Sequence, residues 1–336
     1  MKILVTGAAG FIGMHTAERL LAAGHEVVGL DNLNDYYDVA LKEARLQRLQ
    51  RAKNFRFERI DLADAARMRT LFAAERFEQV LHLGAQAGVR YSLSHPQVYI
   101  DSNVSGTVNV LEGCRHHGVA HLVFASTSSV YGMNAKLPFS PHDGADHPLS
   151  IYSSTKRAGE LLCHNYAALF ALPVTVLRFF TVYGPWGRPD MSPILFARKM
   201  LAGEAIDVFN GGHHRRDFTY VDDIVEGVVR CAQKIPQPDP GWDATHPDPA
   251  TSRAPFRIYN IGNSEPVELL QFIRLLEENL GVEARMNFLP MQPGDVQDTL
   301  ADVGDLERAI GYRPQVSIAE GVRRFVAWYR DYSGAT

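Results

Sequence analysis

Tyr152 and Lys156 lie four residues apart in the segment YSSTK, at the start of a helical pattern. Residues at this spacing share one face of a helix. A free tyrosine titrates at about 10, and a nearby lysine cation favours the phenolate. An isolated pair of this kind is more often a packed aromatic residue beside a solvated charge, so its chemistry depends on what surrounds it.

Four consecutive hydroxyl side chains end the hydrophobic strand pattern in FASTSSVYG, and no carboxylate lies among them. Thr127 stands 25 residues before Tyr152, at the carboxyl end of a predicted strand, where doubly wound folds bind their ligands. Its hydroxyl can therefore hydrogen-bond the same substrate oxygen as Tyr152. Ser128 and Ser129 can bind substrate as well, or they can satisfy backbone groups at the strand end, as such residues often do.

The segment TGAAGFIG places Gly7, Gly10 and Gly13 between the first predicted strand and the first predicted helix. Glycines at this spacing allow a tight turn, let backbone N–H groups approach a pyrophosphate and pack the helix closely on its strand. Asp31 ends the next strand, 18 residues after Gly13, where a carboxylate can accept hydrogen bonds from ribose hydroxyls and repel a 2′-phosphate. These residues predict a site for NAD rather than NADP, and beside such a site the tyrosine and lysine become catalytic candidates. The lysine cation together with the positive nicotinamide of NAD favours the phenolate, which makes the tyrosine a usable base near neutral pH.

Short β-branched segments alternate with longer helical patterns through the first half of the chain, beginning with KILVT, FIGMHTAERLLAAG and HEVVGL. This rhythm predicts βαβ units and a doubly wound α/β fold with a parallel sheet. After about residue 180 glycine and proline interrupt the rhythm, which indicates a smaller second lobe with a surface excursion over 236–255. The basic segment LKEARLQRLQRAK, residues 41–53, is interpreted as a helix with a solvated face.

The composition argues against several other classes of protein. A formal net charge of -4 disfavours a nucleic-acid partner, and 46% hydrophobic with 21% charged residues is typical of a soluble globular chain. The three cysteines show neither metal nor disulfide spacing, and the two pairs of adjacent histidines are poorly spaced to share one ion, so we expect no bound metal. Because no signal peptide or membrane-spanning apolar run is recognisable, we expect a cytoplasmic protein without membrane contact.

Eight segments, in order, resemble the extended short-chain dehydrogenase/reductase family and, within it, the nucleotide-sugar epimerases. They are TGAAGFIG, LGAQAGVRYS, DSNVSG, FASTSSVYG, YSSTK, LRFFTVYGPWGRPD, RRDFTYVDD and YNIGN, and they extend over essentially the whole chain. Among these enzymes the sequence is most similar to UDP-glucuronate 4-epimerases. The resemblance implies NAD as cofactor, a UDP-sugar as substrate, a homodimer, and a 4-keto intermediate formed when a hydride leaves carbon 4 of the sugar.

The resemblance also implies a Rossmann-type NAD-binding domain over 1–180, rejoined by about 217–262, and a smaller α/β substrate-binding lobe for the nucleotide sugar over 181–216 and 263–336. In this arrangement Tyr152 is the base for the 4-hydroxyl, Lys156 is the partner of the ribose and the phenolate, and Thr127 supplies a second hydrogen bond. The cofactor-binding residues implied in this way are Gly7, Gly10, Phe11, Ile12, Gly13, Asp31, Asn32, Asp61, Leu62, Leu83, Ala85, Gln86, Asn103, Tyr152 and Lys156.

A glucuronate substrate would pass through a β-keto acid, which loses carbon dioxide when its carboxylate bond aligns with the carbonyl π system. Fixed hydroxyl donors can hold a carboxylate out of that alignment, whereas a neighbouring carboxylate would repel it. Related decarboxylases and dehydratases usually carry an acidic residue at the position of Ser129. We expect the hydroxyls to restrain the sugar carboxylate and two arginines to bind the diphosphate. The implied substrate-binding residues are Arg90, Thr127, Ser128, Ser129, Thr181, Arg188, Arg216 and Asp295.

Other functions remain open from the sequence. A UDP-glucose 4-epimerase, or another nucleotide-sugar epimerase or decarboxylase, stands beside the UDP-glucuronate 4-epimerase, and so does a catalytically silent NAD-sensing protein. The intact catalytic set argues against the silent protein, and the serines at 128 and 129 argue against the decarboxylase. Two assignments also have plain structural alternatives, because Arg90 can form a surface salt bridge and Asp295 can form a turn.

Overall fold

A computed structural model describes residues 1–291 and 296–334 of the chain. Its largest element is a seven-stranded sheet in the order β10-β6-β5-β4-β1-β2-β3, in which all neighbouring strands are parallel. The strands are β1 (Lys2–Thr6), β2 (Glu26–Asp31), β3 (Phe55–Arg59), β4 (Gln79–His82), β5 (His121–Thr127), β6 (Val174–Phe179) and β10 (Phe256–Ile261).

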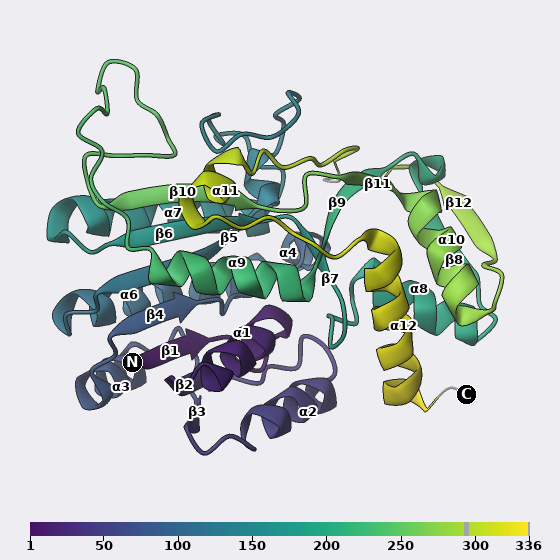
Figure 1. The fold of residues 1–336 in the computed structure, drawn as a ribbon, viewed down its shortest axis with the longest axis horizontal. Coiled ribbons are helices and arrows are strands. Elements are labelled where there is room, and N and C mark those ends of the chain that lie inside the picture. Colours follow the sequence, from purple (N-terminus) through teal and green to yellow (C-terminus); the bar gives the residue numbers. More distant parts are fainter. Residues whose placement is uncertain (292–295, 335–336) are drawn as a thin grey trace.

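Helices cover both faces of this sheet (Figure 1). The side chains of β1 explain why, since Ile3 and Val5 belong to one apolar core and Leu4 belongs to another. A strand that is buried on both faces reads as a continuous apolar run, as β1 does. The predicted doubly wound parallel sheet is therefore confirmed. Its helices are α1 (Phe11–Ala22), α2 (Val39–Leu49), α3 (Ala65–Glu75), α4 (Val89–Ser94), α5 (Pro96–Tyr99), α6 (Gly106–His116), α7 (Ile151–Phe170) and α9 (Val221–Gln233), with a π-helical turn at Ile100–Ser105 and a 3₁₀ turn at Ser128–Tyr131.

A smaller α/β lobe is built mainly from the second half of the chain, as expected. It contains a three-stranded sheet in the order β11-β9-β7 and a two-stranded parallel sheet of β12 and β8. Phe272 and Phe325 of this lobe share the apolar core that contains Ile3 and Val5, so the lobe packs against the larger part without a separate core. Its elements are β7 (Thr181–Tyr183), α8 (Ser192–Leu201), β8 (Ile206–Phe209), a 3₁₀ turn at Asn210–Gly212, β9 (Arg215–Tyr220), β11 (Pro266–Glu268), α10 (Leu269–Leu280), β12 (Met286–Leu289) and α12 (Ile318–Ser333). Helix α11 (Gly304–Ile310) packs instead against α9 and β10 of the larger part (Figure 1).

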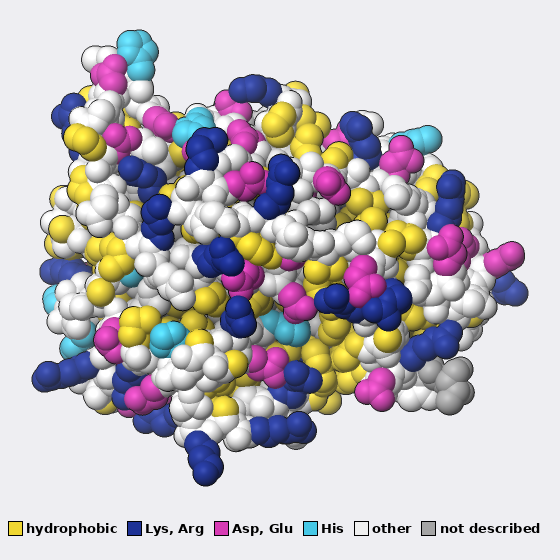
Figure 2. Space-filling model, viewed as in Figure 1, with side chains coloured by type: hydrophobic (Ala, Val, Ile, Leu, Met, Phe, Trp, Pro, Cys, Tyr) yellow, Lys and Arg dark blue, Asp and Glu magenta, His cyan; other side chains and the backbone are white. Residues whose placement is uncertain are grey.

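The expected surface excursion lies between α9 and β10, where a long loop projects from the body of the molecule (Figure 1). Cationic and anionic side chains are interspersed on the face seen in Figure 2. Among the described helices, none has both the length and the apolar composition that crossing a membrane requires.

Candidate active site

A cavity runs along the carboxyl ends of the parallel strands and reaches the first residues of the smaller lobe. This edge is where ligands bind in open α/β sheets. Most of the residues singled out in the sequence meet here. They are Gly7, Gly10, Phe11, Ile12, Gly13, Asp31, Asn32, Asp61, Leu62, Leu83, Ala85, Gln86, Thr127, Ser128, Ser129, Tyr152, Lys156, Thr181 and Arg188.

The glycine turn after β1 leaves no space for side chains. Gly7 has a φ of +69°, in the left-handed region that favours glycine. A Cβ added to Gly7 would lie 2.7 Å from the Cα of Gly84, and one added to Gly13 would lie 2.0 Å from the carbonyl oxygen of Gly7. The close approach of three backbone segments therefore dictates glycine at these positions.

The amino end of α1 forms one wall of the cavity beside this turn. Its N-cap residue, Gly10, has no side chain to accept a hydrogen bond, and its first turn holds no acidic residue. The first N–H groups of a helix have no acceptors within the helix, and the helix dipole adds partial positive charge. The turn and the helix end together fit an anionic pyrophosphate.

Asp31 ends β2 beside the glycine turn. Its carboxylate accepts hydrogen bonds from the backbone N–H groups of Leu33 at 2.9 Å and Ala9 at 3.2 Å, which tie it to the turn. Burial raises the pKa of Asp31, although these bonds and the cations of Lys42 and Arg45 act in the opposite direction. The carboxylate is thus oriented by the backbone and lies near positive charge.

The loops after β2 and β3 meet at this end of the cavity. The side-chain amide of Asn32 donates a hydrogen bond to the carboxylate of Asp61 at 2.8 Å, and Leu62 follows in the lining. Among the described residues, the carboxylates that line the cavity are Asp31 and Asp61. Asp31 ends β2 and Asp61 follows β3, and these strands lie three and four places along the sheet from β5, so the hydroxyl end of the cavity is remote from both carboxylates.

The segment after β4 forms another wall, and Asn103 stands behind it rather than in the cavity lining. The buried Asn103 side chain donates to the carbonyl oxygen of Gln86 at 3.0 Å and accepts from the N–H of Gln86 at 2.8 Å. It also donates to the hydroxyl of Thr155 at 3.0 Å. Asn103 therefore joins the wall that carries Gln86 to helix α7.

Tyr152 and Lys156 project from the first turns of α7. Ser150 and Ser153 form a reciprocal cap, in which each hydroxyl accepts a hydrogen bond from the backbone N–H of the other residue at 3.1 Å. Such a cap satisfies two donors that the helix itself leaves unpaired. It fixes where α7 begins, so Tyr152 and Lys156, about one turn apart, both reach the cavity.

Burial dominates the ionisation of this pair. It raises the pKa of Tyr152 and lowers the pKa of Lys156 to about 8. The Arg188 cation and a hydrogen bond with Thr127 act to lower the pKa of Tyr152, without outweighing burial. The Lys156 ammonium lies 4.3 Å from the centre of the Phe124 ring. In the protein chain alone, burial disfavours the phenolate more than its neighbours favour it. The expectation of a base near neutral pH, which depends on Lys156 together with the positive nicotinamide of NAD, stays a prediction.

Ser126, the first of the four hydroxyls, is anchored from behind the cavity. It donates to the carboxylate of Glu160 at 2.5 Å, and Glu160 accepts two hydrogen bonds from Arg178 at 2.8 and 2.9 Å. The side chains of this ion pair are fully buried. Burial alone would raise the pKa of Glu160, but Arg178 outweighs it and the pKa is lowered. This pair, with the hydrogen bond from Ser126 to Glu160, holds the end of β5 in place.

The remaining hydroxyls face the cavity. Thr127 caps the 3₁₀ turn, since its hydroxyl oxygen accepts a hydrogen bond from the N–H of Ser129 at 3.2 Å. The Thr127 hydroxyl also donates to Ser129 Oγ at 3.3 Å. Ser128 and Ser129 are partly exposed and line the cavity with Thr181, which begins β7. The backbone function suggested for the serines is performed by Thr127 in this turn.

Arg188 lines the cavity from the smaller lobe and pairs with Asp190. Its Nε donates to Asp190 at 3.0 Å, and the hydroxyl of Tyr36 donates to the same carboxylate at 3.0 Å. Tyr36 follows β2, so this contact joins the β2 side of the cavity to the lobe. The bidentate pair occupies guanidinium donors that a diphosphate would also use.

Three predicted substrate residues are not in the described lining. The Arg90 guanidinium lies 4.9 Å from the centre of the Phe209 ring, and Arg216 donates to the carbonyl oxygen of Gln297 at 2.7 Å. Asp295 lies outside the described residues. The geometry of the cavity thus contains Arg188 but neither Arg90 nor Arg216.

The cavity also contains residues that the sequence reasoning did not single out. The clearest signal was the segment NDYYD, two adjacent tyrosines that closely follow the strand ending at Asp31. Residues of the other loops carry no distinctive chemistry and are recognisable only from the fold. The additional lining residues include Asn34, Tyr36, Tyr37, Lys42, Gly84, Ala87, Gly88, Val89, Ser102, Phe179, Phe180, Val182 and Met191.

Comparison with known proteins agrees with this geometry. Residues 3–262 match the model of the NAD dependent epimerase/dehydratase family. The chain is 55% identical over 332 residues to an uncharacterized 37.6 kDa protein of Escherichia coli O111:H-, with 99% of each chain covered. It is 46% identical over 333 residues to a probable UDP-glucuronate 4-epimerase of Rhizobium meliloti (strain 1021), with 98% of this chain and 97% of that protein covered.

A solved structure is similar over the whole chain. It is the UDP-glucuronic acid 4-epimerase from Bacillus cereus in complex with UDP-glucuronic acid and NAD. The TM-score is 0.88 at 35% sequence identity, and the match covers 99% of this chain and 100% of that one.

Proposed function

The chain belongs to the NAD dependent epimerase/dehydratase family, and from that premise we propose that it interconverts UDP-glucuronate and UDP-galacturonate through a 4-keto intermediate. The similarity to UDP-glucuronate 4-epimerases supports this choice of substrate. The observation that carries the proposal is a set of hydroxyls in the cavity beside Tyr152. They belong to Thr127, Ser128, Ser129 and Thr181.

NAD is the cofactor, as the family membership and NAD-bound relatives establish. When bound, it accepts a hydride from carbon 4 of the sugar and returns it. The glycine turn and the amino end of α1 fit its pyrophosphate, because backbone N–H groups and the helix dipole favour an anion. Asp31 is the residue we assign to the adenosine ribose, and its negative charge disfavours a 2′-phosphate there.

Tyr152 is the base that we assign to the 4-hydroxyl. It lines the cavity with Thr127, whose hydroxyl acts to lower the pKa of Tyr152. Arg188 favours the phenolate across the cavity. Lys156, with a pKa of about 8, carries a proton at neutral pH and adds a second cation on the same helix face.

The cavity hydroxyls bind the sugar carboxylate in this proposal. Several directional donors can hold a carboxylate in the plane where its bond to the ring does not align with the 4-keto π system. The carboxylates of Asp31 and Asp61 line the adenosine side, away from β5, so they do not repel an anion at the hydroxyls. An acid at 128 or 129 would repel it, and decarboxylation would then compete with return of the hydride.

A UDP-glucose 4-epimerase is the second candidate, because neutral hydroxyls can bind a hydroxymethyl group as well as a carboxylate. The catalytic residues would act in the same way on either sugar. The two functions differ in what the hydroxyl run contributes, which is restraint of an anion in the first case and simple hydrogen bonding in the second.

We also propose a homodimer through α6, the helix that follows DSNVSG, and α7, the helix that begins at YSSTK. Neighbouring elements of this surface expose large apolar side chains, which include Leu93 of α4, Val98 of α5, Ile100, and Leu161 and Leu169 of α7. Leu161 and Leu169 are 56% and 66% exposed, and a second copy would cover these apolar side chains. Light scattering would compare the molar mass of Leu161→Glu with that of the original protein. The variant should have the lower mass, and equal masses would contradict the proposed interface.

Product analysis by NMR tests the reaction. The purified protein is incubated with NAD and either UDP-glucuronate or UDP-glucose. UDP-galacturonate from the first incubation and no product from the second is the expected result. UDP-galactose alone would favour the second candidate, and a UDP-pentose would show that the hydroxyls do not restrain the carboxylate.

A further inference from the structure

Helix α2 turns two of its cations inward, which corrects the solvated face expected for the basic segment 41–53. The side chain of Lys42 is almost buried and that of Arg45 is completely buried. Lys42 donates to the carbonyl and side-chain oxygens of Asn34 at 2.6 Å and lines the cavity. A charge is buried only at considerable cost unless its donors are satisfied, so Arg45 needs a structural or functional reason.

Arg45 uses its whole guanidinium. Its Nη1 donates to the carbonyl oxygen of Ala9 at 3.1 Å and to the hydroxyl of Tyr37 at 2.7 Å. Its Nη2 donates to the carbonyl oxygens of Trp186 at 2.6 Å and Gly187 at 2.8 Å, and its Nε donates to Trp186 at 3.1 Å. These five hydrogen bonds, formed by a rigid planar fork, match the donor capacity of arginine.

The acceptors belong to opposite walls of the cavity. Ala9 lies inside the glycine turn, between Gly7 and Gly10, and Tyr37 lines the cavity after β2. On the other side, Trp186 and Gly187 immediately precede Arg188, which reaches the cavity from the smaller lobe. One guanidinium therefore joins the cofactor turn directly to the backbone that presents Arg188.

That backbone needs support. Trp186 has a φ of +62°, a left-handed conformation that is unfavourable for a bulky side chain. Its ring packs against Trp328 and Tyr332 of α12, with centroids 5.4 and 5.5 Å apart. His15 of α1 contacts the carbonyl oxygen of Pro185 at 3.0 Å. The ring contacts hold the side chain, while Arg45 and His15 hold successive carbonyl groups.

We propose that Arg45 is a positioning residue for the reaction, which locks the 184–191 segment against the glycine turn so that Arg188 enters the cavity already placed for the UDP-sugar. The inference takes its substrate from the proposed function, whereas the contacts of Arg45 do not depend on that function. Arg45 itself does not line the cavity. Its loss should therefore weaken substrate binding more than the chemical step, because Arg188 would have to be ordered when the substrate binds.

Three variants test the proposal. Arg45→Met removes the donors and keeps an apolar side chain of similar length. Arg45→Lys restores the charge and three donors but not the planar fork. Arg51→Met is the matched control. Arg51 is exposed and lies just after the same helix, and its substitution removes the same charge. For each we would measure amide hydrogen exchange, NAD binding, the thermal midpoint, and KM and kcat for UDP-glucuronate.

The expected result for Arg45→Met is faster exchange in the 184–191 segment and a KM about tenfold higher, with kcat reduced less than about threefold and NAD binding retained. Arg45→Lys should recover part of the KM, and Arg51→Met should match the unchanged protein. Unchanged exchange in this segment, or an unchanged KM, would overturn the proposal. A loss of NAD binding and thermal stability without a selective change in KM would also overturn it, since it would indicate general destabilisation.

The role of Arg45 can still be tested if Arg45→Met does not fold or if the protein does not convert UDP-glucuronate. If Arg45→Met does not fold, Tyr37→Phe removes a single acceptor from Arg45 and should produce a smaller change of the same kind. If the unchanged protein does not convert UDP-glucuronate, the proposed substrate is wrong, but hydrogen exchange still tests the positioning of the 184–191 segment without any sugar. Normal exchange in both Arg45→Met and Tyr37→Phe would then reject the positioning role by itself.

Discussion

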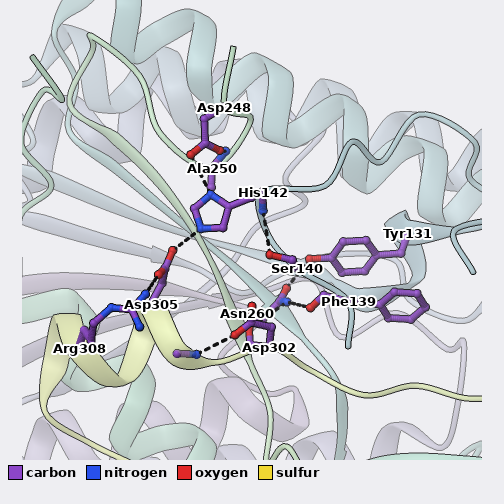
Figure 3. A network of polar contacts seen from close by, with 11 residues as sticks. Tyr131, Phe139, Ser140, His142, Asp248, Ala250, Asn260, Asp302, Asp305 and Arg308 are labelled. Carbon is purple, nitrogen blue, oxygen red and sulfur yellow. Dashed lines mark hydrogen bonds and ion pairs between the residues drawn. The ribbon is translucent and has the colours of Figure 1, made fainter. Parts of the chain in front are cut away.

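The catalytic cavity and a surface cluster around His142 show opposite ways of perturbing titratable groups. In the cavity, burial raises the pKa of Tyr152 and lowers the pKa of Lys156 to about 8. At the surface, His142 lies between Asp248 at 2.8 Å and Asp305 at 2.7 Å (Figure 3). Burial acts to lower the pKa of His142, but the hydrogen bonds and charges of the two carboxylates outweigh it and the pKa is raised.

The difference lies in whether a charged group has compensating partners. His142 bridges the excursion, which contains Asp248, to α11, which contains Asp305, and Arg308 also pairs with Asp305 (Figure 3). The positive charge of His142 is therefore stabilised, and its hydrogen bonds connect two surface segments. In the cavity, burial shifts the pKa values of Tyr152 and Lys156 toward their neutral forms. Such groups can exchange protons with a bound substrate.

Of the substitutions in these two regions, Tyr152→Phe should have the largest effect, which is on turnover. Turnover should fall by at least about 10³-fold, because the phenol hydroxyl is the proposed base, while NAD binding should persist. NMR product assays and a titration with NAD measure the two effects. Normal turnover in this variant would remove Tyr152 from the base role.

Lys156→Met should have the next largest effect, with a characteristic dependence on pH. The pKa of Lys156 is about 8 in the protein alone, so its charge is present at pH 7 and is lost as the pH rises through that value. We expect kcat/KM to fall about 10²-fold at pH 7, and the difference from the unchanged protein to narrow at higher pH. A constant ratio across the pH profile would show that the charge of Lys156 is not what contributes.

Ser128→Ala combined with Ser129→Ala tests whether these two hydroxyls restrain the sugar carboxylate in the cavity. The loss of two donors should increase release of carbon dioxide and UDP-pentose relative to epimerisation by about tenfold, since the bond from the ring to the carboxylate is then free to align with the 4-keto π system. Product ratios by NMR measure this leak. Ser154→Ala, an exposed serine on α7, is the control and should leave the ratio unchanged. An identical ratio in the double variant would return the serines to a structural role.

His142→Gln should have the smallest effect, on stability alone. Because the folded-state pKa is raised, the stabilisation is fully present below the unfolded pKa of about 6.5 and is lost as the pH rises through the folded value. His142 is 43% exposed, so the change in the free energy of unfolding should not exceed ~1 kcal/mol. Urea unfolding at pH 6 and pH 9 measures it. Equal destabilisation at both pH values would exclude a role for the charge.

Much of the cavity was predictable because its requirements are local. The glycine turn is dictated by contacts over a few residues, and Tyr152 and Lys156 share a helix face through their spacing alone. Asn103 shows the limit of such reasoning. Its segment belongs near the cofactor, but its side chain holds Gln86 from behind, a distinction that depends on the packing of α7 against the π-helical turn.

The amino-acid sequence by itself determined the doubly wound sheet, the glycine turn after β1 and the acid-free run of hydroxyls, since periodicity, backbone sterics and short spacings are encoded over neighbouring residues. Only the tertiary structure decided that Arg45 is buried, that Arg188 pairs with Asp190, and that burial raises the pKa of Tyr152. Solvation and charge pairing depend on which distant segments pack together. For a single residue, that environment cannot be read from its neighbours in the chain.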